Sequence, residues 1–484
     1  MKTLRTLLLI IAIFNSYLVF AQQLFFERIF DETLAQASYV IADLNTKEAI
    51  VIDPKRDVDT YIDLVEKKGL KITHITETHI HADFLSGSRE LSAATGAPLY
   101  LSDEGDEDWK YQFPHHPLKN NDQIKIGQFV LEIMHTPGHT PESLTFLLKD
   151  TKNKLNPVKA ITGDFIFVGD VGRPDLLEKS AHIKDAQFIG AKQLFESLKQ
   201  FSKLANNTEI WPGHGAGSFC GKSLSNIPQS TLLAEKQSNP AFRYLNNLND
   251  FSAYILDGQP TPPKYFAVMK QLNKNNRSLI VQQPKYSLLT DKELLQGSKN
   301  NLTIIDTRSK DISAKAFIPN AINIENGKSF STFVGSIVDY DKQIILIADA
   351  SKIDDLTRKL IRIGMDNVYG YTDKIDAIPL QKAQLISKDR FKELLNDKNI
   401  QKIDVRTETE YANGHIEGVE NIPLAQLEKS LNKIKKDQPI IIHCQSGTRA
   451  MIGYSYLLKQ GFTNVLNYSG GINEWFETEE NLTK

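Results

Sequence analysis

Residues 76–87 read T-E-T-H-I-H-A-D-F-L-S-G and directly follow a short apolar run. The pattern predicts a strand that ends in a loop carrying His79, His81 and Asp83. Neutral imidazole and carboxylate groups at this spacing are the ligands that zinc and ferrous iron take in proteins. We therefore expect a metal site at the end of this strand, in preference to three polar side chains on a solvated loop.

Three further clusters have the same setting. They are H-T-P-G-H-T at 135–140, T-G-D at 162–164 and P-G-H-G at 212–215, and each follows an apolar run. Strand-terminal loops are where folds of alternating strands and helices carry their chemistry, so the pattern predicts a layered α/β domain. The side chains placed at these strand ends are His139, Asp164 and His214.

In this order the four motifs resemble those of the metallo-β-lactamase superfamily, over about residues 24–240. The resemblance implies an αβ/βα sandwich with the metal at the edge between its two sheets. Most members have a His at the position of Phe84, and that His binds the second metal of the dinuclear zinc hydrolases. Because a phenyl ring cannot bind a metal, Phe84 speaks against a two-zinc hydrolase.

The persulfide dioxygenase branch of the superfamily is more similar, because it binds one iron and carries a G-R-x-D element after the metal-binding Asp. The resemblance implies that His79, His139 and Asp164 form a 2-His-1-carboxylate set for one Fe(II), with open positions for O2 and substrate. Arg173 and Asp175 match G-R-x-D, which implies a role in shaping the substrate pocket or in holding a carboxylate of the thiol.

By the same resemblance, His81, Asp83 and His214 surround the ligands and orient them without binding metal. A zinc-type alternative stays open, in which His81 joins the two other histidines and Asp164 is a fourth or bridging ligand. Phe84 departs from the persulfide dioxygenase pattern as well, which affects the polar groups around the iron but not the three ligands.

The second half of the chain contains one pattern twice. I-I-D-T-R at 304–308 matches K-I-D-V-R at 402–406, and I-G-M-D-N-V at 363–368 matches Q-G-F-T-N-V at 460–465. Each copy alternates strands and helices, which predicts a parallel sheet covered on both faces.

The second copy carries the sequence C-Q-S-G-T-R at 444–449, between an apolar strand and a helix. Backbone N–H groups and the helix N-terminus would surround the Cys444 sulfur, and Arg449 adds a positive charge. This loop resembles that of the rhodanese sulfurtransferases, over about residues 284–484, and implies a persulfide on Cys444. Counting along the preceding strand places Asp349 opposite this cysteine in the first copy, so we expect no sulfur chemistry there.

The length of 484 residues predicts about three domains, in an α/β multidomain chain. Cys220 and Cys444 fall in different domains, so no disulfide is expected, and Cys220 is interpreted as a small buried thiol. The expected boundaries are a signal peptide at 1–21, a metallo-β-lactamase-like domain at 22–245, an extension and linker at 246–283, a rhodanese-like domain without the active Cys at 284–380 and a rhodanese domain at 381–484.

Lys2 and Arg5 precede an apolar run from Leu7 to Phe20, which predicts a secretory signal peptide cleaved after Ala21 and an exported, periplasmic protein. No other stretch has the length and apolar composition of a membrane span. The net charge of −2 and the lack of a Lys/Arg block argue against nucleic acid as a partner. A homo-oligomer formed through the first rhodanese copy is a further expectation.

Together these features predict an enzyme that oxidises a thiol persulfide to sulfite with O2 at one Fe(II) and moves sulfur through Cys444, with thiosulfate as a further product. Glutathione, coenzyme A and hydrogen sulfide all remain as carriers of the persulfide sulfur. Two alternatives stay open: a zinc-dependent thioester hydrolase of the hydroxyacylglutathione hydrolase type, and a sulfur carrier whose metal domain is degenerate.

Overall fold

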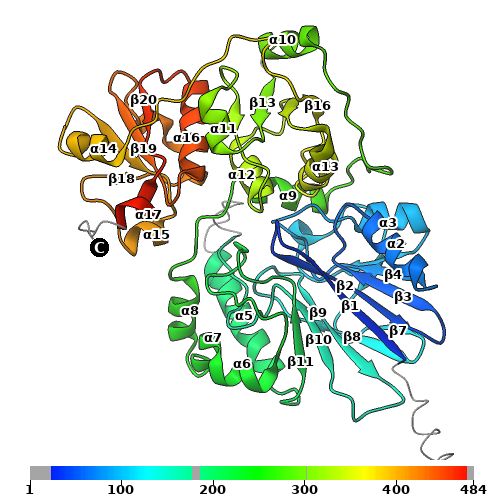
Figure 1. Cartoon of the computed structure of the whole chain (residues 1–484). Coiled ribbons are helices and arrows are strands. Elements are labelled where there is room, and N and C mark those ends of the chain that lie inside the picture. Colours follow the sequence, from blue (N-terminus) through cyan, green and yellow to red (C-terminus); the bar gives the residue numbers. More distant parts are fainter. Residues whose placement is uncertain (1–22, 177–185, 301, 477–484) are drawn as a thin grey trace, which may run out of the picture.

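The structure is a computed structural model that describes residues 23–176, 186–300 and 302–476. The predicted signal peptide at 1–21 lies outside the described residues. Figure 1 shows a large N-terminal unit and two smaller units that lie side by side above it. Within the described parts of the chain, no helix has the length and apolar character needed to cross a membrane.

The N-terminal unit contains two six-stranded sheets. The first sheet follows the chain order β1 (Leu24–Asp31), β2 (Gln36–Asp43), β3 (Glu48–Ile52), β4 (Lys71–Thr76), β5 (Leu99–Ser102) and β6 (His116–Leu118). The second has the order β12 (Ser230–Thr231), β11 (Glu209–Pro212), β10 (Lys159–Gly163), β9 (Leu144–Asp150), β8 (Phe129–His135) and β7 (Gln123–Ile126).

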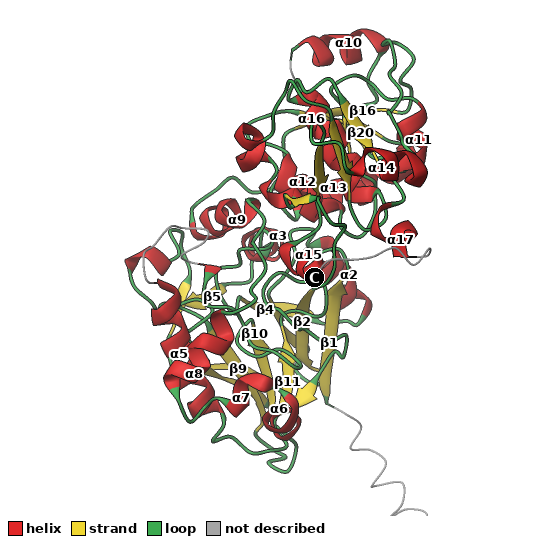
Figure 2. Cartoon of the chain, turned by 90° about the vertical axis from the view of Figure 1, so that its left-hand side faces the viewer, coloured by secondary structure: helices red, strands yellow, loops and turns green. Residues whose placement is uncertain are grey.

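Apolar side chains from both sheets meet in one core, where Ile41 and Ile50 of the first sheet are buried with Leu131 and Phe146 of the second. Helices cover the outer faces (Figure 2), and every residue of strand β2, which has a neighbouring strand on each side, is buried. These four layers confirm the predicted αβ/βα sandwich. The helices are α2 (Asp59–Lys67), α3 (Ser88–Thr95), α5 (Ala186–Phe201), α6 (Leu232–Ser238), α7 (Pro240–Arg243) and α8 (Leu248–Leu256), with the 3-10 turn η1 (Glu107–Trp109).

Helix α9 (Tyr265–Lys274) follows the sandwich and lies between it and the two smaller units in Figures 1 and 2. Asn273 near its end donates to the backbone carbonyls of His81 and Phe84, both at 2.8 Å. The helix is thereby fixed against the loop that carries the first histidine motif.

The two smaller units have the same strand order, which confirms the duplication. In the first, β14 (Ile322–Asn323), β13 (Thr303–Asp306), β15 (Ile344–Ile347) and β16 (Val368–Thr372) form a parallel sheet with α10 (Asp291–Lys299), α11 (Lys310–Lys315), α12 (Phe330–Ile337) and α13 (Ile353–Ile361). In the second, β18 (Glu420–Asn421), β17 (Gln401–Asp404), β19 (Ile440–His443) and β20 (Val465–Asn467) are joined by α14 (Lys388–Leu395), α15 (Glu408–Ala412), α16 (Thr448–Lys459) and α17 (Gly471–Phe476).

The strand register corrects one sequence prediction. Asp306 pairs with Ile347 in the first copy, and Asp404 pairs with His443 in the second. The residue opposite Cys444 is therefore Ala348, and the expectation of Asp349 was wrong by one position. The count failed because it assumed strands with the same start, whereas only the pairing fixes the register. A methyl group cannot accept sulfur, so the expectation of a copy without the active Cys is unchanged.

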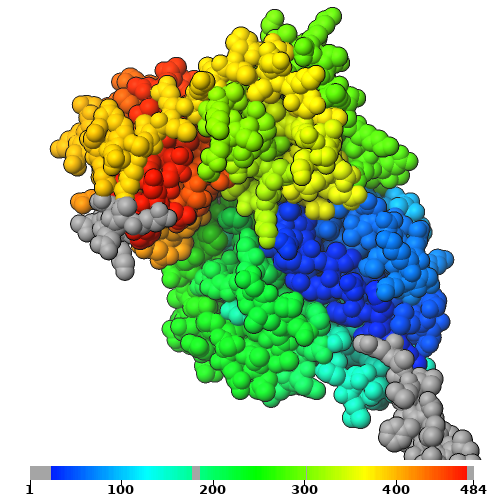
Figure 3. Space-filling model, viewed as in Figure 1, coloured from blue at the N-terminus to red at the C-terminus, as the bar shows by residue number. Residues whose placement is uncertain are grey.

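The first copy lies against both of the other units (Figure 3). Arg362 of this copy forms salt bridges with Asp31 at 2.8 Å and Asp57 at 2.5 Å in the N-terminal unit. The contact with the second copy is largely apolar, with one buried hydrogen bond from the Asn323 amide to Ser455 at 3.0 Å. The first copy thus connects the sandwich to the second copy.

Candidate metal centre and sulfur-transfer loop

Three of the predicted side chains come together at the edge of the sandwich. Among the described residues, His79, His139 and Asp164 form a buried group whose ligand atoms all lie within 4.8 Å of one another. The Asp164 Oδ2 atom is 3.9 Å from His79 Nε2 and 3.5 Å from His139 Nε2. The loops after β4, β8 and β10 therefore deliver these groups to one point.

The environment fixes the tautomer of His139. Its Nδ1 lies 3.0 Å from the backbone carbonyl oxygen of Arg173. A carbonyl only accepts, so Nδ1 carries the proton and Nε2 presents a lone pair. Burial lowers the pKa of His139, against the attraction of the Asp164 carboxylate, which favours the neutral ring that a metal needs.

His79 is held in the same way. The Thr78 hydroxyl donates to Asp53 at 2.9 Å, so its oxygen accepts from His79 Nδ1 at 3.0 Å. The Nε2 of His79 is then an unprotonated, buried atom without a hydrogen-bond partner among the described residues. Burial and the neighbouring His81 hold the pKa of His79 well below its usual value.

Asp164 uses its two oxygens differently. Oδ1 accepts from His214 Nδ1 at 2.6 Å, whereas Oδ2 is buried without a hydrogen-bond partner in the described structure. His214 is also 2.7 Å from Asp83 through Nε2. Burial raises the pKa of Asp164, but the nearby histidines outweigh burial and hold it below its usual range.

These groups fit a metal cation. Two neutral imidazole nitrogens and one carboxylate oxygen converge, and two of these three atoms, on His79 and Asp164, are buried without partners in the described part of the chain. Orphaned buried polar atoms are costly unless something binds them. A set of two histidines and one carboxylate suits iron or zinc, and the hydrogen bonds behind it are those that orient metal ligands.

His81 lies beside this group but not in it. Its ring centroid is 4.2 Å from that of His79 and 4.3 Å from that of Phe84, and its Nε2 is 3.1 Å from Asp53. Burial lowers the pKa of His81, but the carboxylates around it, foremost Asp53, raise it to about 9. Its Nδ1 is buried without a partner among the described residues, so the zinc-type alternative keeps a candidate atom.

The G-R-x-D element is placed as a support for His139. The fully buried Arg173 pairs with Asp175 through two hydrogen bonds of 2.7 Å. It also donates to the carbonyls of Phe219 at 3.1 Å and Pro260 at 2.6 Å. These contacts fit the expected role in shaping the pocket. They speak against the other expected role, holding a carboxylate of the substrate, because Arg173 is fully buried and four of its five N–H donors are bonded to protein groups.

Cys220 is the residue whose position sequence reasoning missed. With Asp83 and His214 it forms a second buried group whose ligand atoms lie within 4.8 Å of one another. Burial and the nearby Asp164 and Asp83 carboxylates raise the pKa of its thiol well above the usual value. Its closeness in sequence to His214 was a signal, but a glycine-rich loop gives no direction to the side chain.

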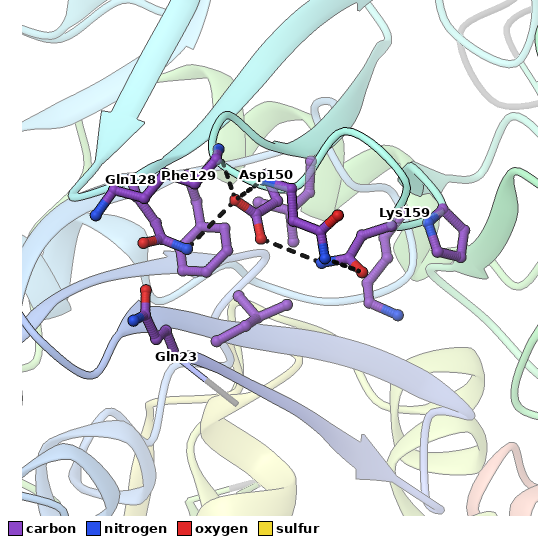
Figure 4. Close-up of a pocket in the computed structure, with 11 residues that line it drawn as sticks. Gln23, Gln128, Phe129, Asp150 and Lys159 are labelled. Atoms are coloured by element: carbon purple, nitrogen blue, oxygen red, sulfur yellow. Dashed lines mark hydrogen bonds between the residues drawn. The ribbon is translucent and has the colours of Figure 1, made fainter. Parts of the chain in front are cut away.

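A cavity of about 180 Å³ adjoins the metal group, with His139 in its wall. A second hollow of about 740 Å³ lies at the opposite end of the sandwich, where β8 begins and β9 ends. Figure 4 shows that Asp150 in this hollow accepts hydrogen bonds from neighbouring groups. One of them comes from the Gln128 side-chain amide at 3.3 Å. Of these two hollows, the one beside His139 is placed to serve the metal group.

The Cys444 loop lies between β19 and α16, as expected. The buried Sγ accepts a hydrogen bond of 3.2 Å from the amide of Gly447, whose φ of 93° suits glycine. Arg449 pairs with Glu410 at 2.6 and 2.7 Å. Burial raises the pKa of Glu410, but Arg449 and Thr407 lower it to about 2.

The first rhodanese copy reaches this loop. The Lys310 Cε atom would lie 3.3 Å from a Cβ placed on Gly447. The copy without the active cysteine thus contributes a cationic side chain beside the cysteine loop of its neighbour.

The comparisons with known proteins agree with this architecture. The metallo-β-lactamase superfamily model matches residues 32–214, and the rhodanese-like domain model matches residues 290–378 and 387–478. A solved metallo-β-lactamase from Staphylococcus aureus subsp. aureus COL is 42% identical, covers 73% of this chain and 100% of its own, and superposes with a TM-score of 0.68. The chain belongs to the metallo-β-lactamase superfamily. It carries two rhodanese-like domains after the superfamily domain.

Two curated relatives of this superfamily domain carry different activities in their names. The mitochondrial persulfide dioxygenase ETHE1 of Bos taurus is 27% identical over 215 residues, which are 43% of this chain and 73% of that protein. A hydroxyacylglutathione hydrolase of Dictyostelium discoideum is 27% identical over 241 residues, which are 49% of this chain and 80% of that protein. At 27% identity these relatives support the family, and they do not distinguish between the two reactions.

Proposed function

We propose that this protein is a sulfur-metabolism enzyme that oxidises a thiol persulfide to sulfite at one ferrous ion. The overall reaction is RSSH + O2 + H2O → RSH + SO3²⁻ + 2 H⁺, in which the outer sulfur is oxidised and O2 is reduced. The observation that carries the proposal is the buried group of His79, His139 and Asp164, in a chain that also holds a rhodanese cysteine.

His79, His139 and Asp164 would hold the iron, which would supply the chemistry that activates O2 toward the persulfide sulfur. The residues around them have separate tasks. The Arg173 carbonyl and Thr78 keep a proton on Nδ1 of each histidine, and His214 holds the outer oxygen of Asp164. Burial of the group excludes bulk water from the reacting sulfur.

Cys444 would serve the second half of the chemistry. A persulfide RSSH transfers its outer sulfur to the Cys444 thiolate with release of RS⁻, and sulfite then attacks that sulfur and leaves with it as thiosulfate. No oxidant is consumed in either step. The Gly447 amide stabilises the negative charge on the sulfur.

The test combines metal content with oxygen uptake. We expect about one iron per chain in protein purified without oxygen, and oxygen uptake with a persulfide that His139→Ala abolishes together with the iron. His116→Ala removes an exposed histidine on β6 and serves as the matched control. Oxygen uptake that survives His139→Ala would overturn the proposal.

The alternative function is thioester hydrolysis with zinc. It is favoured by the unpartnered Nδ1 of His81, and by the hydroxyacylglutathione hydrolases among the relatives. Zinc in the purified protein, with thioester turnover and no oxygen uptake, would establish it in place of the dioxygenase. Export to the periplasm is a separate proposal that rests on the N-terminal sequence, and fractionation of cells with detection of the cleaved chain tests it.

A further inference from the structure

The cavity beside His139 has the features of a binding site for a small molecule. Its volume of about 180 Å³ is below the roughly 300–1,000 Å³ of pockets that hold drug-sized ligands. Most of its wall is apolar, and the side chains come from the His79 loop, η1, the G-R-x-D loop and α9: Ile80, Ala82, Trp109, Leu176, Phe266 and Ala267. Such a wall suits a short aliphatic chain.

Among the lining residues that the structure describes, Lys270 on α9 is the one Lys, Arg, Asp or Glu residue. Its Nζ lies 3.7 Å from the centroid of the Trp109 ring, a cation–π contact. Among the described residues, no hydrogen bond or salt bridge engages this ammonium. Burial lowers the pKa of Lys270, and the Glu142 carboxylate opposes this only from beyond ion-pair distance.

Three acidic groups act on Lys270 from a distance: Glu142, Asp106 and Asp108. Glu142 is fully buried; its Oε1 accepts from the Ile80 amide at 2.7 Å, and its Oε2 has no hydrogen-bond partner among the described residues. Within the described residues none of the three carboxylates forms a salt bridge with Lys270, so Lys270 presents a positive charge to the cavity. An anionic group on a bound molecule would satisfy this charge.

We propose that this cavity binds the organic part of the persulfide, and that Lys270 selects small thiol persulfides that carry one anionic group. The inference deepens the proposed function and rests on it. The aliphatic chain lies between Trp109 and Phe266, the anionic group meets Lys270, and the sulfur end points to His139.

Other carriers fit this cavity less well. Glutathione has two carboxylates and an ammonium, and the apolar wall offers its additional charges no partner, which is costly. A neutral thiol such as 2-mercaptoethanol fits by size but leaves the Lys270 ammonium unpaired. Inorganic persulfide has no aliphatic chain to contact the apolar wall and no separate anionic group to pair with Lys270.

Binding is measured with two inert thioethers of the same chain length, one anionic and one neutral. 3-(Methylthio)propanoate and 3-(methylthio)propan-1-ol are titrated into the iron-loaded protein by calorimetry without oxygen. We expect the carboxylate to bind about tenfold more tightly, as one charge-assisted hydrogen bond allows, and Lys270→Met to remove this preference. Lys274→Met is the matched control, because Lys274 lies one turn further along α9 and donates to the Asp108 carbonyl at 2.9 Å.

Kinetics then test the link to the reaction. With the persulfide of 3-mercaptopropionate, Lys270→Met should raise KM about tenfold and keep kcat, whereas the persulfide of 2-mercaptoethanol should be unaffected. Glutathione persulfide should be the poorest of the three substrates. Lys270→Glu should prefer the persulfide of cysteamine, whose ammonium complements the new charge.

The outcomes separate the two proposals. Three results would overturn the role of Lys270. In calorimetry, these are a wild-type protein with no preference for the carboxylate, or a Lys270→Met protein with the same preference as the wild type. In kinetics, it is an equal loss of activity with all three persulfides at unchanged iron content. Oxygen uptake with none of the persulfides, together with the calorimetric preference, would overturn the proposed function and leave the anion-selective cavity standing.

Discussion

His139 donates from Nδ1 to the backbone carbonyl of Arg173 at 3.0 Å, and the Arg173 side chain is itself anchored by Asp175. The orientation of a candidate metal ligand thus depends on a salt bridge that never touches the metal site. Partners of this kind set ligand geometry as well as ligand basicity.

Arg173→Met should therefore weaken metal binding. The variant leaves Asp175 without its buried partner and releases the loop whose carbonyl orients His139. We expect metal affinity to fall about 10- to 100-fold, measured by competition with a chelator of known affinity. Unfolding free energy should fall too, by about 3–5 kcal/mol, because a buried ion pair loses its cationic member.

The matched control is Arg243→Met, which removes an exposed arginine at the end of α7. It should leave both quantities unchanged. Unchanged metal affinity in Arg173→Met would show that the His139 ring is held by packing alone.

Glu142 makes stability depend on pH. Burial raises its pKa to about 7, so the folded protein holds a proton that the unfolded chain releases near the ordinary value of 4.5. The carboxyl therefore costs stability as pH rises from about 4.5 to about 7, by up to about 3 kcal/mol, and the cost is constant above that range. Glu142→Gln keeps an oxygen for the Ile80 amide and removes the titration.

The measurement is the difference in Tm between Glu142→Gln and the wild-type protein, taken between pH 4.5 and pH 8. We expect this difference to grow in favour of the variant up to about pH 7 and then to level off. A difference that does not vary with pH would mean that Glu142 titrates near its ordinary value.

Cys444→Ser should separate the two activities. Because Cys444 lies in the second rhodanese copy, this variant should lose sulfur transfer from thiosulfate to cyanide and keep oxygen uptake with a persulfide. Its sulfur product should be sulfite in place of thiosulfate, as ion chromatography would show. Asp349→Ala is the control in the first copy, where that side chain is exposed and caps a 3-10 turn. Loss of oxygen uptake in Cys444→Ser would show that the metal site takes its substrate from the cysteine.

The sequence was sufficient to predict that the candidate metal-binding residues lie at strand ends, because motifs that follow apolar runs identify loops at one edge of a sheet. That logic predicted loops that meet at one edge, and the family resemblance selected His79, His139 and Asp164 from them, three residues whose ligand atoms the structure brings within 4.8 Å of one another. It could not predict the partners that fix the tautomers, since Asp53 and the Arg173 carbonyl come from distant segments.

Two further features were beyond the sequence for the same reason. The role of Arg173 follows from the direction of its four hydrogen bonds, and a G-R-x-D string does not contain that direction. The counterpart of Cys444 depends on hydrogen-bonded register, and a count from an assumed strand start misplaced it by one residue. Local pattern therefore predicts where a group lies along the chain, whereas its partners require the fold.

Arg362 supports the last prediction, which concerns the joint between the sandwich and the first rhodanese copy. Its guanidinium is largely buried between Asp31 and Asp57, and its own carbonyl accepts from the Leu85 amide at 2.7 Å. Arg362→Met would leave two carboxylates without this cation, a change that costs about 3–5 kcal/mol when the pair is buried.

In this variant we expect calorimetry to resolve two separate unfolding transitions. The unfolding transitions of the wild-type protein should overlap more, because its units are more strongly coupled. A protease should also cut the variant between the units sooner. Arg390→Met, which removes an exposed pair with Glu393, should behave as the wild-type protein. Because Leu85 follows the histidine motif directly, loosening this joint should also raise the mobility of the His79 loop, so the same variant should lose metal faster to a chelator. An Arg362→Met protein with an unchanged thermogram and metal release rate would show that the apolar contacts and the other ion pairs, such as Arg358 with Asp59 and Arg56 with Asp366, hold the units together without Arg362.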